Sequence, residues 1–389
     1  MTAAAGGERL FTRDFLLVTA ASMLTGGYAI MLLTLTLMYG NDAGFGAGQA
    51  GLLSALFAFA SLGCRPFSGL LCDRFPKKRI FLLAAAGFAV CPAAFLLRAP
   101  FAVLAAARAV QGACMAAAST AAGALATERI PRGRFTEGVG VYGIGMAASA
   151  AAPGVGLRLL AGYGYPGVFL FASLAGLAML ALMLPVRPAP AETPRGGRLR
   201  DGLWEPSALF GSLCTLALTL AQVSVLQFLS YYVKARGASG VGAFYGVSAA
   251  AVIAVRLASG RLHAFAGDRS LLLAGGALLA AAYAGLFLAY PSAPVLGALA
   301  VVYGAGHSLT GMVLNSLTVS GARPERVGAA NAAYLAASDL GYAFGPMLWS
   351  AWCVRMGYLG IYPLAAAAVA VLLAVFAIKV PRRKVQMKG

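Results

Sequence analysis

Residues 65–69 read Arg-Pro-Phe-Ser-Gly and residues 256–260 read Arg-Leu-Ala-Ser-Gly, so the frame Arg-x-x-Ser-Gly occurs twice in the chain. The two copies lie 191 residues apart (256 − 65), about half of the 389-residue length. Residues repeated at such an interval indicate that a chain contains two copies of one structural unit. We therefore expect a fold made of two similar halves.

A second set of repeated residues follows later in each half. Pro153 is matched by Pro346, and Gly164-Tyr165 is matched by Gly357-Tyr358. Both matches have a spacing of 193 residues (346 − 153 and 357 − 164). Proline and glycine mark the bends and ends of helices, so the repeat concerns helix geometry as well as charge.

Between these residues the chain is apolar, with 60% hydrophobic and only 11% charged residues. A soluble protein of this length needs far more polar surface. Apolar runs long enough to cross a bilayer recur along the chain, which predicts an all-α polytopic membrane protein with twelve transmembrane helices in two six-helix bundles. The expected domains are an N-terminal bundle (1–186), a Pro- and Arg-rich cytoplasmic linker (187–205) and a C-terminal bundle (206–389). The twelve helices are expected near 15–38, 49–71, 79–97, 100–127, 138–160, 165–185, 206–233, 241–263, 271–290, 293–320, 328–350 and 357–378.

Positive charge is distributed unevenly between the connecting segments. The net charge is +18, and most of the 30 Lys and Arg residues fall in alternate connections, the linker and the two ends. The positive-inside rule then predicts that both termini are cytoplasmic. A nucleic-acid-binding protein would gather its charge on one soluble face, so we expect no nucleic-acid partner. The expected partners are the lipid bilayer, a small-molecule substrate and protons, and the protein is expected to act as a monomer.

Patterns typical of enzymes and metal sites are absent from the sequence. No GxxxxGK[ST] loop occurs, and the six cysteines show no Cys-x-x-Cys spacing. His263 and His307 share no metal-ligand spacing with acids or cysteines. We therefore expect no enzyme activity, no catalytic residue, no cofactor and no metal.

Three motifs resemble those of the major facilitator superfamily. Residues 69–79 (GLLCDRFPKKR) are similar to its loop between the second and third helices, with Pro76 in place of glycine. Residues 104–112 (LAAARAVQG) resemble the fourth-helix motif, and residues 152–156 (APGVG) resemble the fifth-helix motif associated with antiporters, with alanine first instead of glycine. The resemblance implies two six-helix bundles that move against each other around a central site.

A narrower resemblance concerns one bacterial branch of this superfamily. Residues 65–67 (RPF), 137–143 (EGVGVYG) and 339–346 (DLGYAFGP) resemble efflux permeases, a group that includes exporters of opine-type metallophores. The resemblance implies export from the cell and a multi-pass location in the bacterial cytoplasmic (inner) membrane.

Two charged residues are candidates for proton coupling. Asp339 lies near the middle of a predicted helix, where a charge is costly unless it is paired, hydrated or neutralised by a proton. The alternative is a carboxylate that packs against a neighbouring helix. Arg108 could hold a substrate anion or set the protonation of a nearby acid, or it could be a structural arginine bonded to helix carbonyls. For Arg65 and Arg256 we expect helix-to-helix bonding in preference to substrate contact.

Polar side chains on the predicted helices four, seven and ten are candidates for substrate binding. Hydrogen bonding between helices explains any one of them equally well. The candidates are Arg108, Gln111, Gln222, Gln227, Tyr231, His307 and Asn315.

The resemblance also implies residues that control movement of the bundles. Asp73 and Arg74 are expected to help hold the two bundles in one state, with solvation in an ordinary loop as the alternative. The residue equivalent to Asp73 in the second half is Ala264, so this contact is expected on one side only. Glu137 is a further gating candidate, or else a first-turn acid that caps its own helix. Gly69 and Pro153 complete the gating set through their motifs.

The sequence therefore predicts a secondary active transporter. We expect proton-coupled antiport that exports a small organic solute, such as a drug-like compound, a metabolite or a metallophore, by alternating access. The alternative is proton-coupled uptake of an organic anion held by Arg108, Arg65 and Arg256. A channel is a third possibility, which solute flux that saturates and depends on a pH gradient would exclude.

Overall fold

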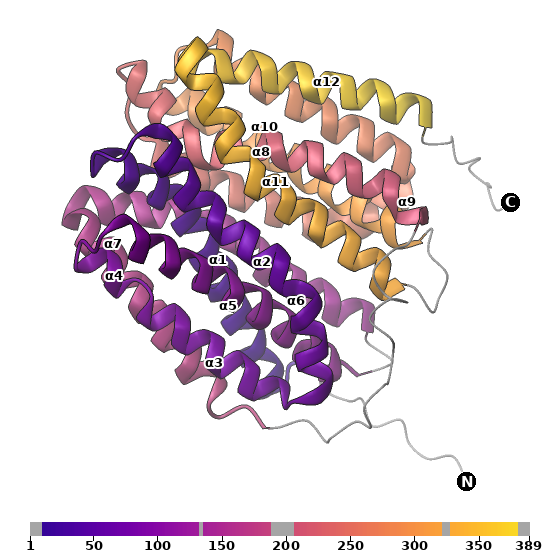
Figure 1. The fold of residues 1–389 in the computed structure, drawn as a ribbon. Helices are drawn as coiled ribbons and strands as arrows, with labels where there is room; N and C mark the ends of the chain where they lie inside the picture. The colour runs from indigo at the N-terminus through magenta and orange to yellow at the C-terminus, as the bar shows by residue number, and fades with distance from the viewer. Residues whose placement is uncertain (1–9, 132–134, 188–205, 321–326, 380–389) are drawn as a thin grey trace, which may run out of the picture.

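The structure of the chain is a computed structural model, which describes residues 10–131, 135–187, 206–320 and 327–379. All regular structure within these ranges is helical (Figure 1). Short 3₁₀ segments occupy Ser149–Ala151, Pro206–Ala208 and Tyr358–Gly360. The α-helices are α1 (Arg13–Asp42), α2 (Ala47–Arg74), α3 (Lys77–Val90), α4 (Ala93–Leu96), α5 (Phe101–Glu128), α6 (Phe135–Ala148), α7 (Ala152–Met183), α8 (Leu209–Ala235), α9 (Val241–Leu288), α10 (Ala293–Ser320), α11 (Val327–Met356) and α12 (Ile361–Lys379).

Two of these helices are interrupted by glycine. Gly164 breaks α7 and Gly267 breaks α9, each with a positive φ and an extended ψ. Only glycine adopts this combination at little cost. Gly357, ahead of α12, has φ 68 and ψ 176, against φ 65 and ψ −170 for Gly164. The repeated Gly-Tyr pair therefore bends the chain in the same way 193 residues apart (357 − 164).

A close helix contact also recurs in both halves. A Cβ added to Gly112 of α5 would lie 2.1 Å from the carbonyl oxygen of Phe57 in α2. A Cβ added to Gly304 of α10 would lie 2.4 Å from the carbonyl oxygen of Ser248 in α9. Small residues let membrane helices approach this closely, where lipid supplies no hydrophobic drive for association. The equivalent contact at equivalent positions supports the duplication read from the sequence.

The described part of the chain contains ten helical segments that are long and apolar enough to cross a membrane. One of them, Val141–Met183, contains the break at Gly164, and α11 is not among the ten. Large apolar side chains face outward, among them Leu83, Leu97 and Val371 at 75%, 81% and 64% exposed. Such a surface suits lipid and not water. The protein is a multi-pass membrane protein.

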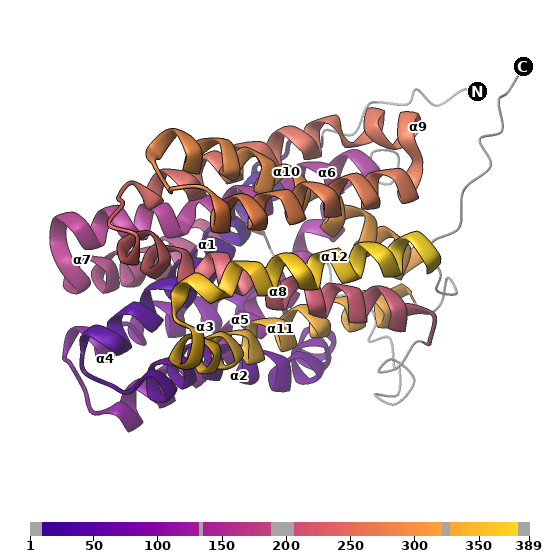
Figure 2. The same ribbon diagram turned by 90° about the horizontal axis from the view of Figure 1, so that it is seen from above.

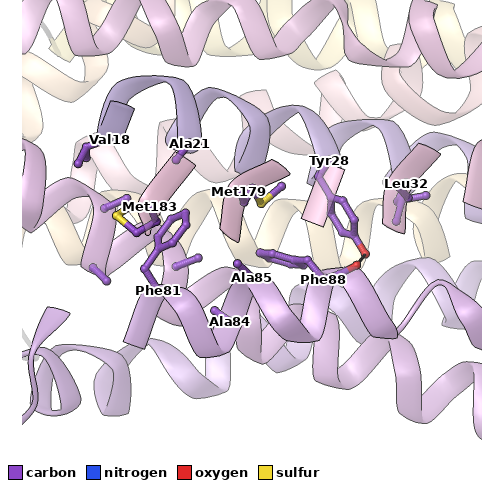
Figure 3. Packing of buried hydrophobic residues seen from close by; sticks show 14 of the residues in the cluster. Val18, Ala21, Tyr28, Leu32, Phe81, Ala84, Ala85, Phe88, Met179 and Met183 are labelled. Atoms are coloured by element: carbon purple, nitrogen blue, oxygen red, sulfur yellow. Dashed lines mark hydrogen bonds between the residues drawn. The ribbon is translucent and has the colours of Figure 1, made fainter. Parts of the chain in front are cut away.

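Each half has its own buried apolar cluster. One cluster draws its members only from residues between Leu10 and Val186, and a second draws almost all of its members from residues between Ala221 and Val369. In the first, the rings of Tyr28 of α1 and Phe88 of α3 lie 4.6 Å apart with their planes tilted by 48°, and Met179 of α7 lies close to them (Figure 3). Figure 1 shows the helices of the first half gathered beside those of the second, with α12 along the upper edge. In Figure 2, which is seen from above, α12 crosses in front of α8.

The two ends of the molecule differ in charge. We call the end where α2 meets α3 the basic end, because residues 74–79 there include Arg74, Lys77, Lys78 and Arg79. The opposite end, where α1 meets α2 and α8 meets α9, is called the far end. Toward the far end the halves are in close contact, since Thr34 of α1 donates to the Leu226 carbonyl oxygen of α8 at 2.6 Å.

Candidate functional site

An ion pair joins the two halves between α2 and α11. The guanidinium of Arg65 donates to the carboxylate of Asp339 through two nitrogens, Nε to Oδ2 and Nη2 to Oδ1, the latter at 3.1 Å. The two helices also meet nearer the far end, where the rings of Phe59 and Phe344 lie edge to face at 5.1 Å. The paired side chains are only 18% and 12% exposed. The Asp339 carboxylate is therefore held across the junction of the halves by a bidentate partner, a strong arrangement for a partly buried acid.

The repeat-related arginine makes an equivalent crossing on the other side. Arg256 of α9 donates from Nη1 to the carbonyl oxygen of Gly143 in α6 at 3.1 Å. The second-half position equivalent to Gly143 is Ala336 (143 + 193), one helical turn before Asp339. Both arginines thus reach the opposite half, at repeat positions about one helical turn apart. We call these contacts the arginine bridges; only the Arg65 bridge contains an acceptor that can take up a proton.

Beside Asp339, three helices of the second half line a polar, partly open cavity of about 140 Å³. On its wall Tyr342 donates to Gln222 Oε1 at 3.3 Å, and Gln222 Nε2 lies 3.3 Å from His307 Nε2. The His307 ring stacks on Tyr303. We call this space the hydroxyl cavity. Its lining residues are Thr215, Leu218, Thr219 and Gln222 of α8, His307, Thr310, Gly311 and Leu314 of α10, and Tyr334, Ser338 and Tyr342 of α11.

Of the predicted substrate-binding residues, Gln222 and His307 are brought together in this cavity. Tyr334, Ser338 and Tyr342 were not predicted, although they recur every four residues along α11. Four-residue spacing places side chains on one face of a helix. A polar stripe of this kind, next to a buried acid, was the signal in the sequence that would have identified them.

Arg108 and Gln111 lie instead inside the first half. Arg108 is fully buried, donates to the Leu53 carbonyl oxygen at 3.1 Å and to Gln111 Oε1 at 2.8 Å, and lies over the ring of Phe57. Gln111 in turn donates to the hydroxyl of Tyr28 at 2.7 Å. Among the described residues no carboxylate pairs with Arg108, and its Nη2 has no hydrogen-bond partner. Its bonds to a helix carbonyl and to Gln111 are those expected of a structural arginine, while its role in proton coupling or substrate binding stays a prediction.

Gln227 and Tyr231 lie on the contact between halves nearer the far end. Ser54 of α2 donates to Gln227 Oε1 at 3.1 Å, and Asn41 of α1 donates to the Tyr231 hydroxyl at 3.1 Å. Neither residue lines the hydroxyl cavity. Asn315 of α10 is also outside the lining set.

The structure describes only some of the side chains expected to control gating. The side chains of Asp73 and Glu137 lie outside the described part of the structure. Arg74 is exposed at the end of α2, and a Cβ on Gly69 would meet no atom within 4 Å. Pro153 is buried at the start of α7, next to Gly154, where a Cβ would lie 2.4 Å from the Gly242 carbonyl oxygen of α9. This part of the antiporter-like motif therefore forms a tight contact between the halves.

A second hollow, of about 550 Å³, lies at the far end of the first half. Tyr39, Asp42, Arg98 and Tyr165 are among its lining residues, and Tyr165 donates to Asp42 Oδ2 at 2.5 Å. Among the described residues no group of three His, Cys, Asp or Glu side chains is placed to hold a metal ion.

Comparison with known proteins places these features in context. A family model described as Major Facilitator Superfamily matches residues 15–346. No curated protein matches the chain. Among many solved structures that match, the crystal structure of a mutant of the nucleoside transporter NupG superposes with a TM-score of 0.76 and 11% sequence identity, covering 94% of this chain and 99% of that one. At this identity the likeness shows the fold alone.

Proposed function

This chain belongs to the major facilitator superfamily, and we propose that it is a secondary transporter in which protonation of Asp339 is coupled to solute movement by alternating access. The observation that carries the proposal is the Arg65–Asp339 ion pair between the halves. A proton on Asp339 removes the negative charge that this pair requires. Uptake and release of one proton would then break and restore a contact between the two moving parts.

The proposed topology has twelve spans in two bundles, 1–186 and 206–389, joined by the linker 187–205. Dividing Val141–Met183 at Gly164 and adding the 30-residue α11 raises the ten apolar segments to twelve. The polar residues of α11, among them Ser338 and Asp339, explain its lower hydropathy. The cluster of basic residues supports assigning the basic end, and with it both termini, to the cytoplasm of a bacterial inner membrane.

In this topology both arginine bridges lie in the cytoplasmic halves of their helices. Arg65 is closer to the cytoplasmic end of α2 than to its far end, and Asp339 lies before the midpoint of α11. Protonation of Asp339 would open the Arg65 bridge and favour opening toward the cytoplasm. The Arg256 bridge ends on a carbonyl oxygen, which does not titrate, so one bridge would respond to protons and the other would not.

Proton-driven antiport follows from this asymmetry if the proton enters from outside. Protonated Asp339 would favour the cytoplasm-open state, where the solute binds and the proton leaves. The restored ion pair would close that side and release the solute outward. This order corresponds to export of a small organic solute by a monomer with no cofactor.

Uptake is the second candidate. An inward direction is compatible with the same bridges, and the solved structure that superposes on this chain is described as a nucleoside transporter. An anion held by three arginines has less support, because Arg65 is engaged by Asp339, Arg108 by Gln111 and Leu53, and Arg256 by Gly143.

Proteoliposomes containing a pH-sensitive dye test the proposal. For an antiporter, adding a transported solute outside acid-loaded vesicles should raise the internal pH in a saturable way. We expect Asp339→Asn to abolish this solute-dependent proton movement while solute-for-solute exchange persists. The matched control is Asp268→Asn, since Asp268 pairs with His263 at 2.6 Å within the second half. Proton movement by Asp339→Asn at the wild-type rate would overturn the proposed coupling.

A further inference from the structure

The hydroxyl cavity presents mainly hydrogen-bond acceptors. Thr215 donates its hydroxyl proton to the Gly211 carbonyl oxygen at 2.8 Å, and Thr310 donates to that of Gly306 at 2.8 Å. Ser338 donates to the carbonyl oxygen of Tyr334 at 3.3 Å. A hydroxyl group has one proton and two lone pairs. These three side chains therefore retain only lone pairs for a molecule in the cavity.

The two phenol groups on the wall also donate their protons within the protein. Tyr342 donates its proton to Gln222, and Tyr334 donates to the Gly311 carbonyl oxygen at 3.4 Å. The amide nitrogen of Gln222 carries two N–H groups, and one of them remains free to donate when the other faces His307. Acceptor oxygens thus predominate over free donors, and a molecule that binds well has to bring donors of its own.

Charge argues against an ionic occupant. None of the residues that line the cavity is Asp, Glu, Lys or Arg. The adjacent carboxylate of Asp339 is already paired with Arg65, so a cation would find no free counter-charge. An anion would face the lone pairs of the wall, so the occupant that fits is neutral.

The size of the cavity further limits the kind of molecule that fits. The volume of about 140 Å³ is close to that of an engineered cavity of about 150 Å³ that holds one benzene ring. We propose that the hydroxyl cavity binds a neutral ring bearing several hydroxyl groups, such as a furanose or pyranose, either free or as part of a larger solute. The inference rests on the proposed transport function and names the chemistry of its substrate.

Ligand-observed saturation-transfer NMR on the purified protein measures this binding without any gradient or transport. The probes are D-ribose, tetrahydropyran as a ring of similar size without O–H donors, and methylammonium as a small cationic donor. We expect saturable transfer to D-ribose and little to the other two. Tetrahydropyran binding as well as D-ribose would overturn the need for donors, and tighter binding of methylammonium would overturn neutrality.

Substitutions of two threonines on α10 test whether D-ribose binds in the hydroxyl cavity. Thr310→Val removes an acceptor from the cavity wall, and we expect about fivefold weaker D-ribose binding. Thr318→Val is the matched control, because Thr318 is buried, donates to the Leu314 carbonyl oxygen at 2.6 Å in the same way and does not line the cavity. Equal effects of the two substitutions, in variants that elute as single species, would place the site elsewhere.

Asp339→Asn separates this inference from the proposed coupling. The variant is expected to bind D-ribose while it fails to move protons. D-ribose binding to a wild-type protein that shows no proton coupling would leave the cavity assignment intact and refute the coupling. Coupled transport of another solute by a protein that does not bind D-ribose would leave the coupling intact and refute the cavity assignment.

Discussion

Removing the charge of Asp339 should shift the balance between the two access states toward opening at the basic end. In the structure Arg65 and Asp339 bond across α2 and α11, and this contact is lost wherever the two helices separate there. Asp339→Asn deletes the ion pair but leaves one carbonyl oxygen that can still accept from Arg65. The equilibrium can move only by the free energy that the contact contributes in one state and not in the other.

The burial of the pair sets the size of this effect. An exposed ion pair contributes about 0–1 kcal/mol, and breaking a fully buried pair costs about 3–5 kcal/mol. Here the side chains are 18% and 12% exposed, which lies between these limits. Allowing for the hydrogen bond that asparagine retains, we expect about 1.4 kcal/mol, or about a tenfold change in the ratio of the two states.

A cysteine at position 68 reports this change. Ser68 is buried one helical turn beyond Arg65 toward the basic end, on the same face of α2. In a background without the six native cysteines, Ser68→Cys is labelled with an impermeant thiol reagent in inside-out membrane vesicles. We expect Asp339→Asn to raise the labelling rate about tenfold, while Asp268→Asn leaves it unchanged.

The double variant Arg65→Gln/Asp339→Asn provides an internal check. If the two residues act through their mutual contact, the double variant should label no faster than the faster single variant, because the same interaction is lost once. An increase below about twofold in Asp339→Asn, in protein that still folds, would show that the ion pair does not hold the basic end closed. Additive effects in the double variant would show that the two residues act separately.

Three further tests concern the packing and geometry of the helices. Arg108→Lys should lower thermal stability by about 1.5–3 kcal/mol, since an ammonium group does not reproduce the planar guanidinium contacts to Leu53 and Gln111; an unchanged melting temperature would contradict the structural role. Gly154→Val should weaken closure at the far end, because even a Cβ at this position would lie 2.4 Å from a carbonyl oxygen of α9. Gly162→Val is the control and should leave closure unchanged, because a Cβ at Gly162 would meet no atom within 4 Å. Thiol labelling from the far side measures the difference between the two variants. Gly164→Ala should cost about 1–3 kcal/mol in thermal unfolding, because alanine is strained at φ 65.

Most helices could be predicted from sequence to within a few residues at their ends, but the helix predicted at 138–160 is divided at Ser149–Ala151 into α6 and the start of α7. Apolar run length, together with glycine and proline, is a local property of the chain, and lipid imposes helical hydrogen bonding wherever the chain crosses it. The breaks at Gly164 and Gly357 were visible for the same reason. The two helices predicted on either side of Gly267 are likewise separated by a kink, because Gly267 has a φ of 67 and a ψ of 166 inside α9.

Which polar residues of α8 face the cavity could not be predicted from the sequence. Gln222 and Gln227 were both expected at the substrate site, but five residues turn a helix by about 140° beyond a full turn. Gln222 therefore faces α10 and the hydroxyl cavity, while Gln227 meets Ser54 of the opposite half. The rotation of a helix about its own axis is set by the small residues that pack against its neighbours and not by its own pattern.

The sequence alone determined the duplication, the apolar helices, the excess of positive charge in alternate connections and the presence of a buried acid in α11. These features follow from composition and spacing along the chain. The pairing of Arg65 with Asp339, the crossing of Arg256 to Gly143 and the formation of the hydroxyl cavity were decided only by tertiary structure. Arg65 and Asp339 are 274 positions apart, and Arg256 and Gly143 are 113 apart. Which residues meet depends on how two bundles dock and how each helix is rotated within its bundle.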